Sequence, residues 1–475
     1  MSNRLHSFHG HSDPEPIGLE YIVSSLNQLG YTYTFLSSNE LEIIDSLNGK
    51  TISLFTALTS EWEKVLLLAS EAKKRGNFTI VGGYHTSGLS GLTDRESIPE
   101  VFDLLIAGEG EEIVLKILEE YGSKGSFDRY ESKIIKSSPI QNLDSLAFPH
   151  RDARFLSNYN LLDLMWPPAS LQRNVAIILA SRGCLYNCDF CASSSVWGRG
   201  VRYRSVNNVI NELEDLRNRF GTNTLLVIDQ SFGQNKKWTT DLCENIQAAH
   251  FGMNWYHQSN LSLTKETIYS MAKAGCTKIG FGMEGISPSA IDFIKPQNPH
   301  DYNAINDLFD YCNSLGIFIK VYLMIGFPWE TKEIIRDYFQ WITMLRANEI
   351  KISYFTPFPG TKVWEKHSNS LVSANWEDFD TVSKAVVYNP NISIADYHRI
   401  RQTLFNKFYS SDTYSDVTHR MITNYPHYHL SFKEFVPYLK QFNMVTGEEE
   451  WMKWFNDEAK MISLNRPVIK HAEFF

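Results

Sequence analysis

The stretch ILASRGCLYNCDFCASSSVWGRGVRYRS, residues 178–205, holds Cys184, Cys188 and Cys191, which are half of the six cysteines in the chain. Thiolates bind soft or borderline metals, and a structural zinc ion normally takes four protein ligands. No second pair of Cys or His of that spacing accompanies these three cysteines. An iron-sulfur cluster held by three thiolates leaves one iron open to another ligand, which is a catalytic arrangement. The spacing therefore predicts a catalytic iron-sulfur cluster on this loop.

Composition and charge argue against several other classes of protein. The chain has 475 residues, of which 43% are hydrophobic and 21% charged, as expected for a folded protein of two or three domains. The formal net charge of -9 gives no electrostatic reason to expect nucleic acid or an anionic membrane as a partner. The N-terminal residues contain no apolar signal core, and no run approaches the roughly 20 apolar residues of a membrane span, so we expect a cytoplasmic protein. Cys243, Cys276 and Cys312 are isolated, and we expect them to be core residues.

The first 120 or so residues alternate between helical and strand patterns. Helical spacing covers residues 19–29 and 61–76, and strand patterns cover 31–36, 51–58, 78–83 and the start of 103–121. This alternation predicts a parallel, Rossmann-like sheet covered by helices. Ligands of such sheets bind at the carboxyl ends of the strands. The candidate cofactor-binding residues at these ends are Thr59, Gly82, Gly83 and Glu109.

A second series of strand and helix units follows from residue 173. The predicted strands cover residues 175–180, 224–229, 254–258, 278–284, 320–326 and 352–358. Six such units predict a partial (β/α)6, TIM-like barrel, in which chemistry is placed on the loops after the strands. The cysteine loop directly follows the first of these strands.

The organisation along the chain is therefore an α/β fold with four parts. We expect a Rossmann-like domain over residues 1–137, a linker over 138–172, the partial barrel over 173–365 and a helical C-terminal cap over 366–475. The cap contains helical patterns over residues 393–409 and 447–462 and carries no phosphate loop or cysteine.

The chain resembles the radical S-adenosylmethionine superfamily, and in particular the subgroup with an N-terminal cobalamin-binding domain. The motifs that carry this resemblance are SRGCLYNCDFC, WGRGVRYRS, VIDQSFGQN, AGCTKIGFGMEGIS, YLMIGFPWET and FTPFPGTKVWE, and in the N-terminal part PIGLEYIVSSLNQLGY, IVGGYHTSG and DLLIAGEGEE. The resemblance implies a 4Fe-4S cluster whose open iron is chelated by S-adenosyl-L-methionine. An electron from the reduced cluster then breaks a carbon-sulfur bond to make a carbon radical.

Residue by residue, the resemblance implies that Cys184, Cys188 and Cys191 hold the cluster. It also implies that further residues contact S-adenosylmethionine near its adenine, amino end, carboxylate and adenosine. The residues implied in these contacts are Phe190, Arg204, Asp229, Gln230, Ser231, Glu284, Gly326, Phe327 and Pro328. Gln258, with Ser259 and Asn260, stands where relatives often have Arg-x-Asp.

Several functions remain open at this stage. One is methylation of a carbon of a small molecule or peptide with cobalamin as a further cofactor, although the cobalt-binding motif DxHxxG does not occur in the chain. A second is a cobalamin-independent radical reaction such as aminocarboxypropyl transfer. A third is a non-catalytic iron-sulfur or zinc protein for electron transfer. For an enzyme, we expect a reducing partner such as flavodoxin or ferredoxin and no membrane or nucleic acid.

Overall fold

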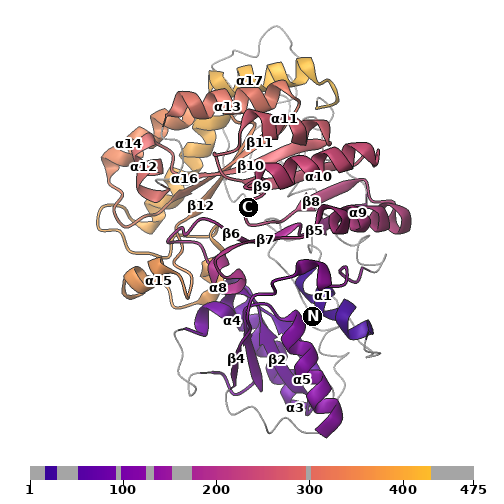
Figure 1. Ribbon diagram of the computed structural model, residues 1–475. Helices are drawn as coiled ribbons and strands as arrows, with labels where there is room; N and C mark the ends of the chain where they lie inside the picture. Colours follow the sequence, from indigo (N-terminus) through magenta and orange to yellow (C-terminus); the bar gives the residue numbers. More distant parts are fainter. Residues whose placement is uncertain are drawn as a thin grey trace. The chain divides into compact units, whose positions relative to one another are not determined.

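The computed structural model describes residues 17–28, 52–91, 98–124, 133–151, 174–295 and 301–428 (Figure 1). The chain forms two compact units. The first unit comprises Met1–Asn160, Ala180–Asn208 and Thr356–Asp380, and the second comprises Leu161–Leu179, Val209–Phe355 and Thr381–Phe475. The predicted bounds of the four parts stay a prediction.

A four-stranded parallel sheet forms the centre of the first unit. Its strands are β1 (Ile52–Thr56), β2 (Phe78–Gly82), β3 (Leu104–Ala107) and β4 (Ile134–Lys136), and they lie side by side in this order. The predicted parallel sheet is therefore confirmed. The strand predicted over residues 31–36 lies outside the described residues.

Helices cover both faces of this sheet, which explains why its strands are apolar at successive positions. The helices are α1 (Ile17–Gln28), α3 (Trp62–Lys74) and α5 (Glu111–Lys124). Val81 packs in one core with Trp62 and Leu68 of α3. The next residue back along β2, Ile80, packs in a second core with Leu26 of α1 and Ile117 of α5. Neighbouring strand residues therefore face opposite helices.

Later segments of the chain complete the first unit. They include the antiparallel hairpin of β6 (Ser181–Cys184) and β7 (Gly200–Tyr203), with α8 (Ser193–Trp197) between its strands. The remaining short helices are η1 (Thr59–Glu61), α4 (Tyr84–Leu89), η3 (Leu143–Ser145), α15 (Lys362–His367), η6 (Ser368–Ser370) and η7 (Trp376–Asp380). Gly88 of α4 lies against Pro359, whose carbonyl oxygen would be 2.2 Å from a Cβ at position 88, so α4 can accept this segment only with a glycine there.

The second unit contains a six-stranded parallel sheet in sequential order. Its strands are β5 (Val175–Ile178), β8 (Thr224–Val227), β9 (Asn254–Ser259), β10 (Cys276–Glu284), β11 (Phe318–Ile325) and β12 (Glu349–Tyr354). Every pairing is parallel, and β5 and β12 are the two edges. All six predicted strands are confirmed, and their sequential order is that of a partial (β/α)6 barrel.

Helices join these strands and extend beyond them. They are α9 (Val206–Phe220), α10 (Lys236–Ala248), α11 (Lys265–Lys273), α12 (Pro288–Ile294), α13 (Tyr302–Ser314), α14 (Lys332–Trp341), η5 (Ile342–Met344), α16 (Ile394–Tyr409) and α17 (Asp412–Asn424). Side-chain caps mark several starts: Thr264 accepts the N–H of Thr267, and Thr331 accepts that of Ile334. The helix predicted over residues 393–409 is confirmed as α16, whereas 447–462 lies outside the described residues.

Among the helices of the described residues, none is both long and apolar enough to cross a membrane.

Candidate active site

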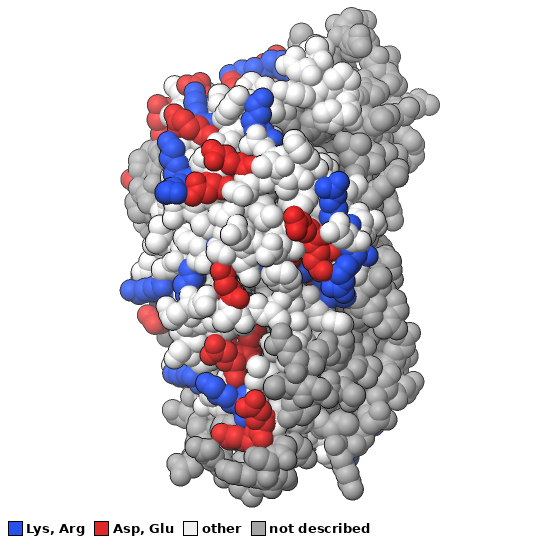
Figure 2. Space-filling model, turned by 45° about the vertical axis from the view of Figure 1, so that its right-hand side comes forward, with Lys and Arg blue, Asp and Glu red and all other residues white. Residues whose placement is uncertain are grey.

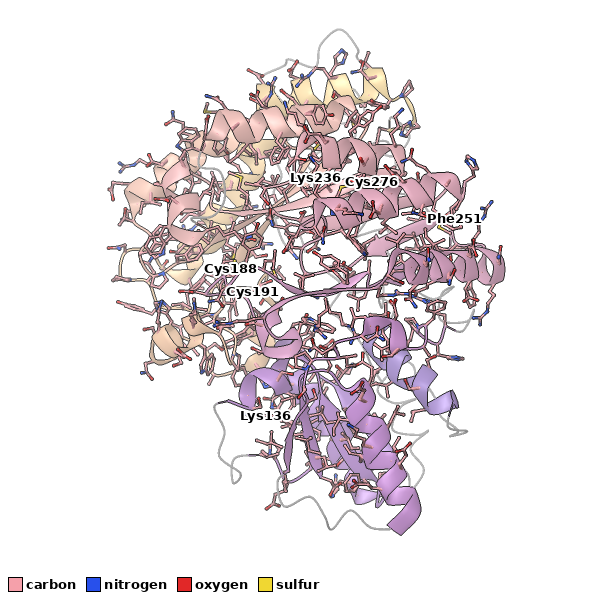
Figure 3. The ribbon with its side chains drawn as sticks, in the orientation of Figure 1. Lys136, Cys188, Cys191, Lys236, Phe251 and Cys276 are labelled. Atoms are coloured by element: carbon pink, nitrogen blue, oxygen red, sulfur yellow. The ribbon has the colours of Figure 1, made fainter. Side chains whose placement is uncertain are left out.

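The cysteine loop leaves the end of strand β6, where a close hairpin positions it. Cys184 is paired with Gly200 of β7. Gly183 has a φ of +91°, and a Cβ at this position would lie 2.1 Å from the carbonyl oxygen of Gly200. Only glycine therefore allows the strands to approach at this point. Farther along, Cys191 donates its N–H to the carbonyl of Cys188 at 3.1 Å, and Figure 3 shows these two cysteines on the same loop.

The three motif cysteines differ in exposure from the three isolated ones. Cys184, Cys188 and Cys191 are half-buried, whereas the isolated cysteines are buried. Burial raises the pKa of Cys243 to about 12, and it also raises the pKa of Cys276 and Cys312. A thiol that resists ionisation is a poor metal ligand, so the chemistry of the donor set favours the motif.

Two further observations concern these thiols. None of the six cysteines, all of which lie in the described ranges, forms a disulfide. No group of three or more His, Cys, Asp and Glu side chains among the described residues is gathered as a metal site would be. The motif cysteines fit a cluster by their number, spacing and accessibility, although the structure does not bring their three thiols together.

Asp189, between the second and third cysteines, ties the loop to α15. Its carboxylate accepts hydrogen bonds from Lys362 at 2.8 Å and Lys366 at 3.2 Å, and its backbone carbonyl accepts the N–H of Val363 at 3.1 Å. The hydrogen bond from Lys362, followed by that from Lys366, holds the pKa of Asp189 below its ordinary value. This charged side chain therefore anchors the middle of the loop.

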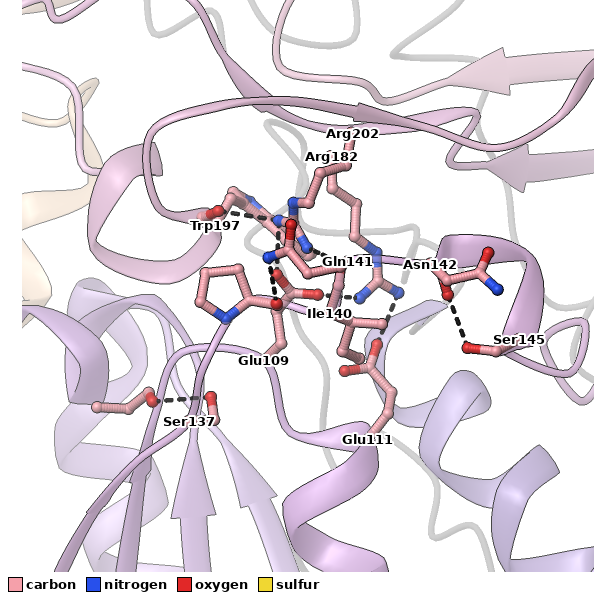
Figure 4. Close-up of polar contacts among 12 residues, drawn as sticks. Glu109, Glu111, Ser137, Ile140, Gln141, Asn142, Ser145, Arg182, Trp197 and Arg202 are labelled. Atoms are coloured by element: carbon pink, nitrogen blue, oxygen red, sulfur yellow. Dashed lines mark hydrogen bonds and ion pairs between the residues drawn. The ribbon is translucent and has the colours of Figure 1, made fainter.

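A buried group of charges lies beside the start of the loop (Figure 4). Arg182, two residues before Cys184, donates from its two terminal nitrogens to Glu109 and Glu111, each at 2.7 Å. Arg202, which is paired with Arg182 across the hairpin, contacts the other oxygen of Glu109 at 2.6 Å. The structure thus places Glu109, predicted as a cofactor-binding residue, in contact with the two strands that lead into and out of the cysteine loop.

Aromatic rings enclose the guanidinium of Arg182. The ring centroids of Tyr21 and Trp197 lie 5.0 Å and 5.1 Å from its central carbon. Burial by itself would lower the pKa of Arg182, but the carboxylate of Glu111, together with Tyr21 and Glu109, raises it above its ordinary value. Arg182 therefore remains a permanent cation at this buried position.

Arg204 is engaged near the other end of the hairpin. Its Nε donates to Asn208 Oδ1 at 2.6 Å, its Nη2 donates to the carbonyl of Asn208 at 3.2 Å, and its guanidinium lies 5.5 Å from the ring centroid of Phe148. The Arg204 side chain is buried, and its hydrogen bonds to Asn208 give it a structural role in this part of the fold. Phe190, in the loop, is half-buried.

The predicted strand-end glycines of the first unit differ in their surroundings. A Cβ at Gly82 would make an ordinary contact of 3.7 Å with the carbonyl of Ile106. Gly83 has a φ of +103°, and a Cβ there would lie 2.7 Å from Thr56 Oγ1 and 2.8 Å from the carbonyl of Ala57. Gly83 is therefore required for the tight turn after β2.

Thr59, which begins η1 shortly after the end of β1, has a histidine as its partner. Thr59 Oγ1 lies 3.2 Å from His85 Nδ1. Burial lowers the pKa of His85 to about 3, so the imidazole is neutral at pH 7. Its ring packs against Trp62 at 4.6 Å and Trp376 at 4.9 Å.

In the second unit, the loops after β8 and β9 are joined by hydrogen bonds. Asp229 is buried and Gln230 half-buried directly after β8. Asn260 Nδ2 donates to Ser231 Oγ at 3.1 Å, and Phe232 donates its N–H to the carbonyl of Gln258 at 2.9 Å. The structure therefore brings the predicted residues of these two strand ends together.

The exposed side chain of Gln258 in β9 also contacts a tyrosine of β11, on the other side of β10. Its Nε2 donates to the hydroxyl of Tyr322 at 3.1 Å, and this hydroxyl lies 2.6 Å from that of Tyr256. A Cβ at Gly280 would lie 2.6 Å from the Tyr256 hydroxyl, so glycine at this position makes room for the tyrosine pair.

Deeper in the same sheet, Glu349 bridges two buried lysines. Its two oxygens lie 2.7 Å from Lys278 Nζ and 2.6 Å from Lys320 Nζ. Burial lowers the pKa of Lys278 to about 8, while the nearby lysines lower the pKa of Glu349 despite its burial. The sequence pattern did not identify this group, because charged residues within apolar strands give no periodic signal.

Glu284 ends β10 in an unusual backbone conformation. It has a φ of +67°, and the register of β10 against β11 shifts between Gly282 and Glu284. Its carboxylate accepts a hydrogen bond from Lys295 at 3.1 Å, and the same Nζ donates to the carbonyl of Gly282 at 3.1 Å. The predicted site residue is thus a paired carboxylate at a strained strand end.

The turn of Gly326, Phe327 and Pro328 after β11 is held by a buried carboxylate. Glu330 Oε2 accepts the N–H of Gly326 at 2.8 Å, the N–H of Phe327 at 3.2 Å and the hydroxyl of Tyr397 at 2.8 Å. Burial raises the pKa of Glu330 to about 7. Glu330 lies within the motif YLMIGFPWET, so the sequence did contain a signal for this residue. Its contact with the backbone N–H groups of Gly326 and Phe327, however, exists only in the folded turn.

Comparison with known proteins identifies the class of enzyme. The model of the radical SAM superfamily matches residues 178–342, from the end of β5 through all three motif cysteines to α14. The chain contains a radical SAM domain. Such a domain uses a 4Fe-4S cluster and S-adenosylmethionine, so the alternative of a non-catalytic electron-transfer protein is set aside.

Relatives and solved structures extend this radical SAM likeness over most of the chain. An uncharacterized methyltransferase of Pyrococcus horikoshii is 28% identical over 396 residues, covering 77% of this chain and 82% of that protein. The hopanoid C-3 methylase of Methylococcus capsulatus is 26% identical over 389 residues, covering 77% and 71%. The structure of the radical S-adenosylmethionine methyltransferase TsrM from Kitasatospora setae, with cobalamin and a 4Fe-4S cluster bound, matches with a TM-score of 0.65 at 14% identity, covering 94% of this chain and 97% of that one. The structural match shows that the fold is shared.

Proposed function

We propose that this radical SAM enzyme transfers a methyl group to a carbon of a small molecule or peptide, with a corrinoid as an additional cofactor. The observation that carries its radical chemistry is the set of three accessible cysteines at the end of β6, within the matched domain. The methyl-transfer part is supported by the two relatives named as methyltransferase and methylase.

In this proposal, Cys184, Cys188 and Cys191 hold the cluster, and Phe190 lies near the adenine. A 4Fe-4S cluster held there would supply one electron to the sulfonium of S-adenosylmethionine for cleavage of a carbon-sulfur bond. The tether from Asp189 to Lys362 and Lys366 holds the loop in one conformation. Such fixed geometry is what a one-electron reaction at a bound sulfonium requires.

Further residues are assigned to S-adenosylmethionine as part of the same proposal. They are Arg204, Asp229, Gln230, Ser231, Gln258, Glu284, Gly326, Phe327 and Pro328. The turn at Gly326 and Phe327 is supported by Glu330, whose carboxylate occupies both backbone N–H groups. The carbonyl of Phe327 accepts hydrogen bonds from Asn389 Nδ2 at 2.9 Å and from the N–H of Glu330 at 3.1 Å, so we assign the backbone contact with a nucleoside to the carbonyl of Gly326.

We assign the corrinoid to the carboxyl ends of β1 and β2, where Thr59, Gly82 and Gly83 lie. The short loops at one edge of a parallel sheet fit a nucleotide-like group. DxHxxG is absent from the chain, so this site offers cobalt no histidine from that motif. A corrinoid bound here would be held by the backbone of these loops and by the hydroxyl of Thr59.

The reaction also needs a strong reductant, and a cytoplasmic flavodoxin or ferredoxin fits this need. Acidic and basic side chains lie interspersed over the described part of the face in Figure 2, which shows no broad field of one sign there. This distribution and the net charge of -9 favour a substrate other than nucleic acid.

The experiment begins with anaerobic purification and reconstitution with iron and sulfide. Hydroxocobalamin is added, and gel filtration measures the corrinoid retained for each chain. The reduced protein is then incubated with S-adenosylmethionine, and the products are separated by liquid chromatography. Cys188→Ala is the matched control, because it removes a cluster ligand from the same loop.

We expect retained corrinoid, 5′-deoxyadenosine and S-adenosylhomocysteine from the wild type, and neither cleavage product from the Cys188→Ala variant. A protein that forms the cluster but retains no corrinoid would overturn the methylation proposal. Formation of 5′-methylthioadenosine would instead indicate aminocarboxypropyl transfer. These outcomes separate radical chemistry in general from methyl transfer in particular.

A further inference from the structure

One carboxylate joins both strands of the hairpin that carries the cysteine loop. Glu109 Oε2 accepts from Arg182 of β6 at 2.7 Å, and Glu109 Oε1 lies 2.6 Å from Arg202 of β7. Glu109 itself belongs to the loop after β3 of the parallel sheet. Glu109 therefore connects both strands of the hairpin to the carboxyl edge of this sheet (Figure 4).

Burial makes this connection sensitive to a change in charge. The side chains of Arg182 and Glu109 are 2% and 0% exposed, and that of Arg202 is 12% exposed. Glu111 adds a second carboxylate on Arg182 at 2.7 Å, so two cations face two anions. Removing one anion from such a group leaves a buried cation uncompensated, which costs more than the loss of an exposed ion pair.

The same group reaches both ends of the cysteine loop. Arg182 precedes Cys184 by two residues, at the entry to the loop. Trp197 ends the helix that follows Cys191, and its carbonyl accepts a hydrogen bond from Arg202 at 2.9 Å. The ring of Trp197 also lies 5.1 Å from the guanidinium carbon of Arg182.

We propose that Glu109 is a positioning residue for the iron-sulfur cluster, acting through Arg182 and Arg202 on the two ends of the cysteine loop. This assigns to the loop after β3 a role in holding the cluster. It rests on the proposed function in one respect, namely that Cys184, Cys188 and Cys191 bind the cluster. Arg182 links the sheet edge to the start of the loop through its hydrogen bond to Glu109, and Arg202 links it to the end of the loop through its ion pair with Glu109 and its hydrogen bond to the carbonyl of Trp197.

The test uses Glu109→Gln in the full-length reconstituted protein. This variant keeps the shape of the side chain but removes its charge. The rate of iron release to bathophenanthroline is measured, together with the electron paramagnetic resonance spectrum of the reduced cluster. Asp103→Asn is the matched control, because Asp103 pairs with Lys73 at the opposite end of the same strand.

We expect Glu109→Gln to release iron about tenfold faster than the wild type, since the variant loses its charge-assisted hydrogen bond with Arg182. We also expect a changed resonance spectrum, because the loop that bears the ligands is displaced. Asp103→Asn should match the wild type in both measurements. Thermal unfolding of the cluster-free proteins separates this effect from general destabilisation.

Arg202→Lys provides a second test if Glu109→Gln does not fold. It keeps the positive charge but cannot contact Glu109, the carbonyl of Ile140 and that of Trp197 together. Wild-type rates of iron release and an unchanged spectrum in a folded variant would overturn the inference. An equal change in Asp103→Asn would also overturn the inference, because it would show that Glu109 contributes only to the general stability of the sheet. A wild type that binds no cluster would instead contradict the proposed function.

Discussion

Glu330 allows a quantitative prediction about the turn after β11. The residue is fully buried, and burial raises its pKa from the ordinary 4.5 to about 7. Between these two pH values the folded protein holds a proton that the unfolded chain has released. The free energy of unfolding therefore falls as the pH rises from about 4.5 to about 7, by about 1.4 kcal/mol for each pH unit. The full difference is about 3 kcal/mol.

The change to test is Glu330→Gln. A glutamine keeps a carbonyl oxygen that can accept the N–H groups of Gly326 and Phe327, but it does not titrate. We therefore expect the stability of the variant, relative to the wild type, to increase by about 3 kcal/mol between pH 4.5 and pH 7. Tyr397, which donates to the same oxygen, has its pKa raised by burial and by Glu330, so it stays protonated in this window.

Urea unfolding of the two proteins at several pH values and constant ionic strength measures this difference. Glu330→Ala serves as a control, because it removes the acceptor and should be less stable than Glu330→Gln at every pH. Parallel stability curves for the wild type and Glu330→Gln would refute the reasoning, since they would mean that Glu330 does not change its protonation between the two states in this range.

Two further predictions concern the cysteine loop. Cys188→Ala should lose iron, acid-labile sulfide and the brown colour after reconstitution, whereas Cys243→Ala should keep all three and lose only about 1–3 kcal/mol of stability through poorer packing. Loss of iron from Cys243→Ala would show that the ligand assignment is wrong. Gly183→Ala should lower the thermal stability by about 2–4 kcal/mol and reduce cluster retention, because its Cβ would collide with the carbonyl of Gly200. Gly18→Ala, with open space around the new Cβ within helix α1, should be neutral or slightly stabilising, and equal losses in both glycine variants would contradict the steric argument.

The parallel architecture could be predicted from local patterns. Each strand of the second unit is a short apolar run followed by a helical stretch, and such runs have one stable arrangement, a parallel sheet with helices on its surface. The helix caps at Thr264 and Thr331 are also local, since each hydroxyl binds a backbone N–H only three residues away. The position of the cysteine loop after the first barrel strand follows in the same way.

The spacing of Cys184, Cys188 and Cys191 is likewise enough to predict a cluster, because ligand number and type are properties of the residues themselves. The contacts that hold these cysteines in place cannot be predicted from their spacing. Glu109 meets Arg182 across 73 positions of sequence, and Lys362 meets Asp189 across 173. No pattern within a window of sequence contains such a pair. Burial, which decides the charge and strength of each contact, exists only once the sheet, the hairpin and α15 have come together.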